Sequence, residues 1–222
     1  MSMLLCVVTP LAVFMAADSR QYPSGADTVQ KVFLVGKDAI VSHGGIGVIP
    51  HDGGSWDAAE ELKRIAAATA SGTFQEQFNF IRQQVMSSIS VALRHYTARF
   101  SNNPHFTIML AKRNSAGRTY FARQEFKLIS TESSPDKWIH RVEANPVQTL
   151  VDGETARSGV WWDVPPECRV TPPPKIDLSP KAAFDSISGI IRVVAGQSAY
   201  CTQMIGGPIR AAISDAGGAR WF

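Results

Sequence analysis

The sequence predicts an α+β fold in which two β-sheets pack together and helices cover their outer sides. Strand-like segments come in hairpin pairs, 3–8 with 11–17 and 31–35 with 39–43. Helix-like segments follow these pairs, and another lies near the end of the chain. Each segment has an apolar face, and two sheets under outer helices would bury all of these faces. We therefore expect a single domain over 1–222, built as a four-layer αββα sandwich.

The first two hairpins differ in their patterning. The first is apolar on both faces and is interrupted only at Thr9-Pro10, which is typical of a hairpin with no face in water. The second turns around Gly36-Lys37-Asp38. Both patterns predict antiparallel pairs near the centre of the fold.

Two consecutive helices are expected next. Ser55 is a candidate N-cap for a helix that runs to about Ala70 and ends at Gly72. Thr73 and Glu76 then form a capping box. The helix that it opens carries an apolar stripe at three- and four-residue steps: Phe74, Phe78, Ile81, Val85, Ile89, Leu93, Tyr96 and Phe100.

The middle of the chain holds one further hairpin and one obscure segment. The hairpin joins 106–111 to 120–126 across Asn114-Ser115-Ala116-Gly117. Residues 129–178 contain two proline groups, Pro165-Pro166 and Pro172-Pro173-Pro174, which force extended backbone. We expect this segment to be irregular and insert-like.

The last part of the chain predicts one helix and one hairpin. Ser179-Pro180 is a helix start, and Phe184, Ile187, Ile191 and Val194 form the buried stripe. Residues 209–213 and 220–222 then read as the closing hairpin.

Composition excludes several classes of function. A net charge of +3 gives no reason to expect nucleic acid or an anionic membrane as a partner. The five histidines are scattered, so neither a metal site nor a cofactor is expected. Three cysteines, an odd number without metal-like spacing, favour a reducing, cytoplasmic location over a disulfide scaffold.

A secretory signal is the competing interpretation of the N-terminus. Met3 to Ala17 is apolar apart from Thr9, and Ala16-Ala17 resembles a cleavage site. No Lys or Arg precedes the run, however, and Thr9-Pro10 interrupts its centre. Fifteen residues are also short for a transmembrane helix, which needs about 20. A buried hairpin explains the run better.

Three residues near the N-terminus suggest a nucleophile and its supporting charges. Removal of Met1 would make Ser2 the first residue, with a hydroxyl nucleophile and an α-amino base on the same residue. The α-amino pKa is ordinarily about 7.7–8. A Lys31 ammonium nearby would lower it further, and a buried Asp18 carboxylate would hold that lysine.

The motifs around these residues resemble those of the proteasome β-subunit and HslV family of N-terminal-nucleophile hydrolases, which includes bacterial proteasome homologues. The segment Ala16-Ala17-Asp18-Ser19-Arg20 resembles the family's A-A-D-S-R, and Ser2 precedes Asp18 by the family's 16 residues. Thr28-Val29-Gln30-Lys31-Val32 resembles T-V-K-K-V. His43-Gly44-Gly45 resembles A-G-G, and 205–209 resembles the family's last helix-to-strand turn.

The resemblance implies an αββα sandwich of the N-terminal-nucleophile type and a threonine/serine-type peptidase. It assigns Ser2 as nucleophile, Lys31 as the cation beside the amine, Asp18 as its anchor and the Gly45 N–H as oxyanion donor. Implied partners are a peptide or unfolded-protein substrate and identical subunits in stacked rings, with an ATPase partner left open. No cofactor is implied.

The chain departs from the family pattern at several positions. The family begins with Thr where this chain has Ser2, and Thr202 and Ile205 stand where the family carries Asp and Ser. Three alternatives therefore stay open: a catalytically silent ring subunit, a small-molecule amidase of the same fold, and a secreted binding module.

Overall fold

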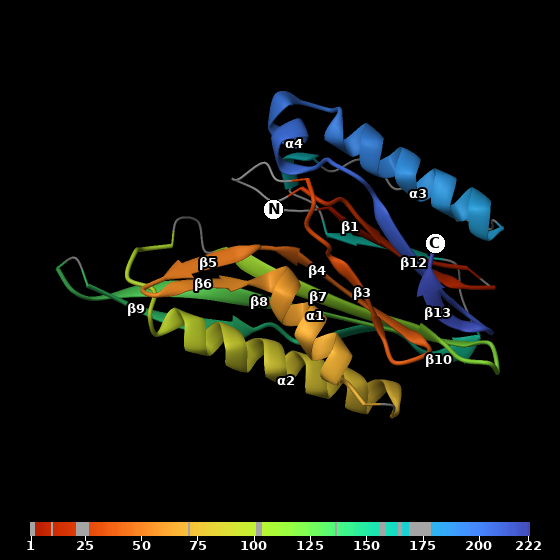
Figure 1. The fold of residues 1–222 in the computed structure, drawn as a ribbon, viewed down its shortest axis with the longest axis horizontal. Coiled ribbons are helices and arrows are strands. Elements are labelled where there is room, and N and C mark those ends of the chain that lie inside the picture. Colours follow the sequence, from red (N-terminus) through yellow and green to blue (C-terminus); the bar gives the residue numbers. More distant parts are fainter. Residues whose placement is uncertain are drawn as a thin grey trace.

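The chain folds into antiparallel β-sheets with helices on their outer faces (Figure 1). The structure is a computed structural model. It describes residues 3–9, 11–20, 27–70, 72–100, 104–135, 137–155, 159–163, 166–168 and 179–222.

The first sheet combines strands from the beginning and the end of the sequence. Its order is β11–β1–β2–β12–β13, and every neighbouring pair is antiparallel. The strands are β1 (Leu4–Val8), β2 (Val13–Ala17), β11 (Gly159–Asp163), β12 (Arg210–Asp215) and β13 (Gly218–Trp221).

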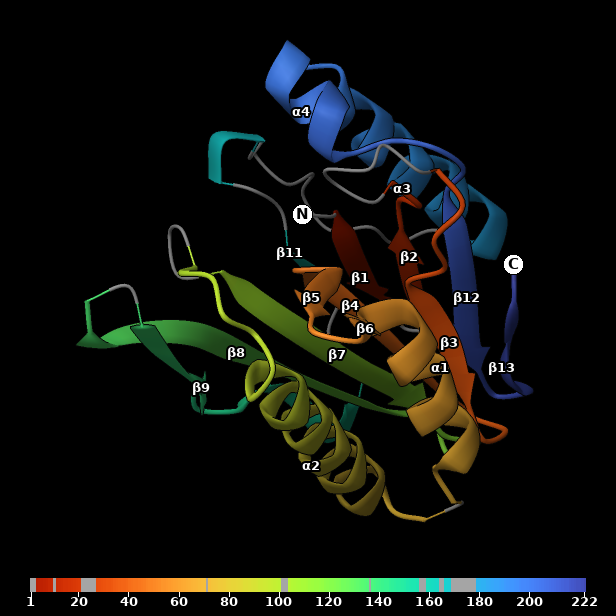
Figure 2. The same ribbon diagram turned by 60° about the vertical axis from the view of Figure 1, so that its left-hand side comes forward.

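The second sheet has the order β10–β8–β7–β4–β3, and β9 also pairs with the long strand β8. Its strands are β3 (Val32–Val35), β4 (Ala39–Gly45), β7 (His105–Arg113), β8 (Arg118–Ser134), β9 (Lys137–Ala144) and β10 (Gln148–Thr155). A small separate hairpin consists of β5 (Val48–His51) and β6 (Gly54–Asp57). Figure 2 shows the β8–β9 hairpin extending beyond the helices that flank the sheets.

Helices pack on both outer faces. Helices α1 (Ala58–Ala68) and α2 (Phe74–Leu93) bury Leu62, Phe78 and Ile81 against the second sheet. Helices α3 (Pro180–Ala195) and α4 (Ala199–Met204) cover the first sheet together with the short 3-10 turn η1 (Pro166–Cys168). A third apolar cluster lies between the two sheets.

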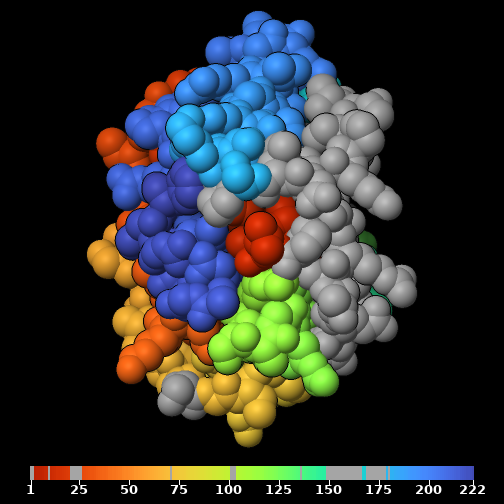
Figure 3. Space-filling model, turned by 90° about the vertical axis from the view of Figure 1, so that its right-hand side faces the viewer, coloured from red at the N-terminus to blue at the C-terminus, as the bar shows by residue number. Residues whose placement is uncertain are grey.

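The alternation of side chains explains why the first hairpin is apolar throughout. Phe14 and Ala16 of β2 contact the α3 side, whereas Val13 and Met15 point into the cluster between the sheets. Both faces of the strand are therefore buried. Figure 3 shows this N-terminal region as a small red patch enclosed by the blue C-terminal segments and the green β7–β8 region.

The coarse prediction, a mixed α+β fold with antiparallel sheets, is confirmed. The paired strands of the first two predicted hairpins are present as β1–β2 and β3–β4. The N-terminal-nucleophile type of sandwich is a finer assignment and stays a prediction. Within the part of the chain that the structure describes, no helix is long and apolar enough to cross a membrane.

Helix boundaries differ from prediction at two points. Ser55 is not a cap, because Gly54–Asp57 pairs as strand β6, and the Asp57 side chain accepts hydrogen bonds from Ala59 and Glu60 N–H. The second helix ends at Leu93, although Phe100 continues the apolar stripe and stacks on Tyr96 beyond the helix. The capping box of Thr73 and Glu76 is confirmed.

The segment 129–178 is more regular than predicted. It contains the end of β8 and strands β9, β10 and β11. The β8–β9 ladder runs from Phe126↔Ala144 to Ser134↔Lys137. The prediction of an irregular segment was wrong because both proline groups follow β11 in the sequence and do not interrupt the strands. Pro166 is in η1, while Pro165, Pro172, Pro173 and Pro174 lie outside the described residues.

Candidate functional site

The structure brings Asp18 and Lys31 together. Asp18 directly follows β2 and Lys31 directly precedes β3, so the two residues come from different sheets. Lys31 Nζ lies 3.0 Å from Asp18 Oδ1, and the two side chains are 2% and 0% exposed. The ion pair that the sequence predicted is therefore present and almost completely removed from water.

Asp18 is held by backbone donors as well as by the lysine. Its Oδ1 accepts the Met3 N–H at 2.9 Å, and its Oδ2 accepts the N–H groups of Gly206 at 3.1 Å and Arg20 at 3.2 Å. With Lys31, four donors converge on one carboxylate. Such a carboxylate is fixed in position, because each oxygen has two partners.

Burial dominates the electrostatics of the pair. It lowers the pKa of Lys31 below that of an exposed lysine, while the Asp18 carboxylate acts in the opposite direction. Burial likewise raises the pKa of Asp18, against the lowering effect of Lys31 and the Gly206 N–H. A lysine whose pKa is lowered in this way gives up a proton more readily than an ordinary surface lysine.

Arg20 connects three segments around the pair. Its guanidinium forms a bidentate pair with Asp27, at 2.6 and 2.8 Å, and donates to the Thr202 carbonyl at the end of α4. Its own carbonyl accepts a hydrogen bond from Lys31 Nζ. Arg20 therefore positions the lysine through its main chain and the surrounding loops through its side chain.

The turn after α4 needs its glycines. A Cβ at Gly206 would lie 2.6 Å from Arg20 Cζ, and one at Gly207 would lie 2.5 Å from Ser19 Oγ. Gly207 also has a φ of +74°. Without a Cβ at these two positions, the turn lies close enough to Asp18 for the Gly206 N–H to donate to its carboxylate.

His43 lies opposite Lys31 on the neighbouring strand. The His43 N–H donates to the Lys31 carbonyl, and the ring stacks on Phe106 with centroids 5.6 Å apart. The imidazole is 2% exposed, and neither ring nitrogen has a hydrogen-bond partner among the described residues. Burial, together with the Lys31 charge, lowers the His43 pKa to about 3. His43 is therefore a buried, neutral residue of strand β4.

Gly45 ends strand β4, two residues beyond His43. Its φ is +87°, and a Cβ there would lie 2.2 Å from the His105 carbonyl oxygen. The local backbone alone therefore requires glycine, so the residue type is no argument for an oxyanion hole. The predicted role of the Gly45 N–H stays a prediction.

Ser2, the predicted nucleophile, lies outside the described residues. An open hollow of about 300 Å³ lies beside the Lys31 segment. Its lining includes Gln30 and Phe33 from that segment, Asp57 and Lys63 from the α1 region, and Arg210 from β12.

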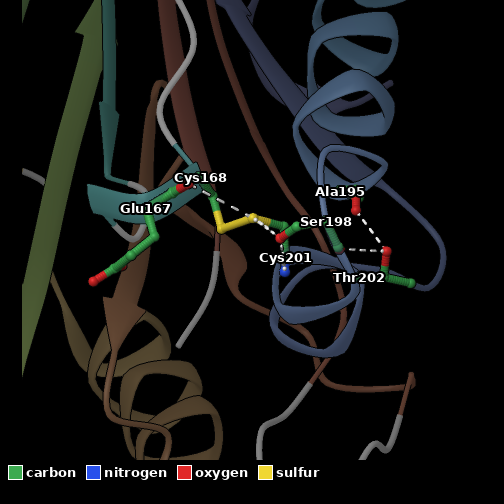
Figure 4. The surroundings of a disulfide bond; sticks show 6 residues. All are labelled: Glu167, Cys168, Ala195, Ser198, Cys201 and Thr202. Atoms are coloured by element: carbon green, nitrogen blue, oxygen red, sulfur yellow. Dashed lines mark hydrogen bonds between the residues drawn. A yellow bond between two sulfur atoms is a disulfide. The ribbon is translucent and has the colours of Figure 1, made fainter.

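Ser198 and Thr202, at the start of α4 and within it, have structural roles. The Ser198 side chain caps α4 by accepting the Cys201 N–H at 3.1 Å. The Thr202 hydroxyl donates to the carbonyls of Ala195 and Ser198 (Figure 4). The Ser198 hydroxyl binds the start of α4 and the Thr202 hydroxyl links α4 to the end of α3, and no hydrogen bond joins either hydroxyl to the ion pair.

A disulfide between Cys168 and Cys201 was not expected from the sequence. It joins η1 to α4, with the two Cα atoms 5.8 Å apart, and leaves Cys6 as a buried free thiol (Figure 4). The cysteine count suggested reduced thiols, and that prediction was wrong for this pair. Their separation of 33 residues gave no signal, because only the tertiary fold brings η1 beside α4.

Sequence reasoning also missed the Gly206 N–H and the Arg20–Asp27 bridge. The Gly206-Gly207 pair was the available signal for the first, since adjacent glycines mark a close backbone approach. In the part of the chain that the structure describes, no group of three His, Cys, Asp or Glu side chains could hold a metal ion. No protein-family model matches the chain, and no curated protein sequence matches it either.

Proposed function

We propose that the protein is an N-terminal-nucleophile peptidase in which Ser2 attacks a peptide carbonyl after removal of Met1. The observation that carries the proposal is the buried Asp18–Lys31 pair, whose carboxylate also binds the Met3 N–H. Burying two charges is expensive, and a buried pair in which burial raises the pKa of Asp18 and lowers that of Lys31 favours a functional site over a structural one.

The position of Met3 supports Ser2 as the reacting residue. The Met3 N–H that binds Asp18 belongs to the peptide bond with residue 2. Covalent geometry keeps consecutive Cα atoms about 3.8 Å apart. The Asp18 carboxylate therefore binds the residue to which Ser2 is covalently attached.

In the proposed reaction, the Ser2 amine accepts the proton of the Ser2 hydroxyl as its oxygen attacks the carbonyl carbon. Lys31 keeps that amine neutral and stabilises negative charge, while Asp18 and the Arg20 carbonyl hold the lysine. An ester forms on Ser2 with release of the amine product, and water then hydrolyses it. The αββα architecture of this enzyme class and its stacked rings of identical subunits belong to the same proposal.

The first test is the intact mass of the natively expressed protein, followed by hydrolysis of a fluorogenic peptide set. Loss of one Met residue exposes the Ser2 amine, and a peptide β-lactone should then label Ser2. Retained Met1 with no labelling would favour the silent ring subunit. Hydrolysis of small amides without hydrolysis of peptides would favour the amidase.

Lys31→Met tests the mechanism directly. We expect turnover to fall by about 10²–10⁴-fold, because the amine loses the cation that keeps it neutral. Lys112→Met is the matched control, since Lys112 forms an ion pair with Asp38 at 2.6 Å at the other end of the β3–β4 hairpin. Unchanged hydrolysis in a folded Lys31→Met protein would overturn the mechanism.

A further inference from the structure

The Cys168–Cys201 disulfide connects α4, which leads to one backbone donor of the Asp18 carboxylate, with the segment after β11, whose partner strand β1 follows another donor. On one side, Cys201 lies in α4, which leads directly into the turn whose Gly206 N–H binds Asp18. On the other side, Cys168 follows β11, whose residue Asp163 pairs with Leu4 of β1. Met3, the residue before Leu4, supplies another N–H to Asp18.

The connections therefore form a closed path through the site. It runs from Asp18 to Met3, along the β1–β11 ladder, across the disulfide and back through α4 and Gly206. The disulfide is the covalent cross-link of this path, whereas the ladder and the two contacts at the carboxylate are hydrogen bonds. Both sulfur-bearing residues are fully buried.

The geometry of α4 makes it dependent on this link. The helix has six residues, and Cys201 and Met204 are the two buried ones. A helix this short is unstable by itself and takes its stability from tertiary contacts. Its carbonyl at Thr202 also receives the Arg20 guanidinium, so movement of α4 disturbs a second support of Lys31.

We propose that the Cys168–Cys201 disulfide is a positioning element of the Asp18 site, whose reduction loosens the Gly206 turn. A dithiol reductant would be oxidised to its cyclic disulfide and deliver two electrons and two protons, which leaves thiols on Cys168 and Cys201. The consequence for activity rests on the function proposed above, whereas the loosening of the turn does not.

Amide hydrogen exchange measured by NMR tests the structural part of the proposal without reference to activity. The samples are the oxidised protein, the dithiol-treated protein and a Cys168→Ala/Cys201→Ala variant. We expect exchange at Gly206 to accelerate by about tenfold or more in the second and third samples. The Leu110 amide in the centre of the second sheet should keep its rate, which would exclude global unfolding.

Cys6→Ala is the matched control, because it removes the buried free thiol and keeps the disulfide. It should exchange like the oxidised parent. Equal acceleration at Gly206 and Leu110 would make the disulfide an ordinary staple of the whole fold and overturn the proposal. An unchanged exchange rate at Gly206 would also overturn the proposal. The same holds if all three cysteines of the natively folded protein react as free thiols with an alkylating reagent.

Activity provides the second readout. The hydrogen bond from the Gly206 N–H lowers the pKa of Asp18 against the raising effect of burial. Loss of this hydrogen bond should therefore move the acidic limb of the pH–activity profile to higher pH. A lower kcat with an unchanged KM should accompany this shift. If the oxidised protein has no peptidase activity, the proposed function fails, while the exchange data still decide the role of the disulfide.

Discussion

Two lysine–aspartate pairs at opposite ends of the β3–β4 hairpin differ in everything except their residue types. Lys31 and Asp18 are 2% and 0% exposed, and the carboxylate has three additional backbone donors. Lys112 and Asp38 are 12% and 38% exposed, and they line an open hollow of about 540 Å³. Water reaches the second pair and is excluded from the first.

The comparison teaches that the surroundings of an ion pair decide how strongly its two charges depend on each other. Near water, both members of a pair keep favourable hydration, and little depends on their contact. In the interior, each charge depends on the other, because transfer from water costs several kcal/mol per ion. The Asp18–Lys31 pair is therefore a costly arrangement. A role in the reaction proposed for Ser2 would explain why the pair is kept beside Met3.

The largest expected effect is on stability when one member of the buried pair is removed. Asp18→Asn should lower the free energy of unfolding by about 3–5 kcal/mol, because it leaves Lys31 charged and buried. Lys112→Met should cost no more than about 1 kcal/mol. Urea denaturation of both variants checks the difference.

The double variant Asp18→Asn/Lys31→Met sharpens this comparison. With both charges gone, it should regain most of the stability that Asp18→Asn loses. It should remain inactive in peptide hydrolysis. A double variant as unstable as the sum of its single changes would mean that the two residues do not act as a pair.

His43 gives the site a pH-dependent effect on stability. Its folded-state pKa of about 3 lies below its ordinary value of 6.5, so the unfolded chain binds the extra proton between these pH values. Stability should therefore fall as the pH drops from about 6.5 towards about 3, by at most about 1.4 kcal/mol per pH unit.

The His43→Leu variant should show a shallower fall in urea titrations across the same pH range, with the remainder due to carboxylates whose pKa is lowered, such as Glu76 and Asp215. His95→Gln, which removes an exposed imidazole, is the matched control and should keep the parent's slope. A His43→Leu protein that follows the parent's curve would show that another group causes the acid sensitivity.

The smallest expected effect concerns the start of α1, beside the hollow next to Lys31. Asp57→Ala should destabilise the protein by about 1 kcal/mol, since Asp57 Oδ1 accepts two N–H groups of the helix. Ser55→Ala should have almost no effect, because Ser55 lies in β6. Thermal denaturation compares the two, and the reverse order would restore Ser55 as the cap.

Local patterns predicted much of the fold correctly. The hairpin interrupted at Thr9-Pro10 and the capping box at Thr73 involve residues close in sequence, whose preferences act over a few positions. The boundary at Ser55 failed for a related reason. Ser is a good cap by itself, but pairing of β6 with β5 takes that residue into a strand.

The sequence by itself determined the residue types of the candidate site and the burial of the segments that carry them. The apolar runs before Asp18 and after Lys31 both predicted buried strands. Only the tertiary structure decided which groups meet there. The Gly206 N–H and the Cys168–Cys201 bond reach the site from more than 130 residues away in sequence, where no local pattern constrains the pairing. Contacts at that separation depend on how the sheets and helices pack, and packing is a property of the whole chain.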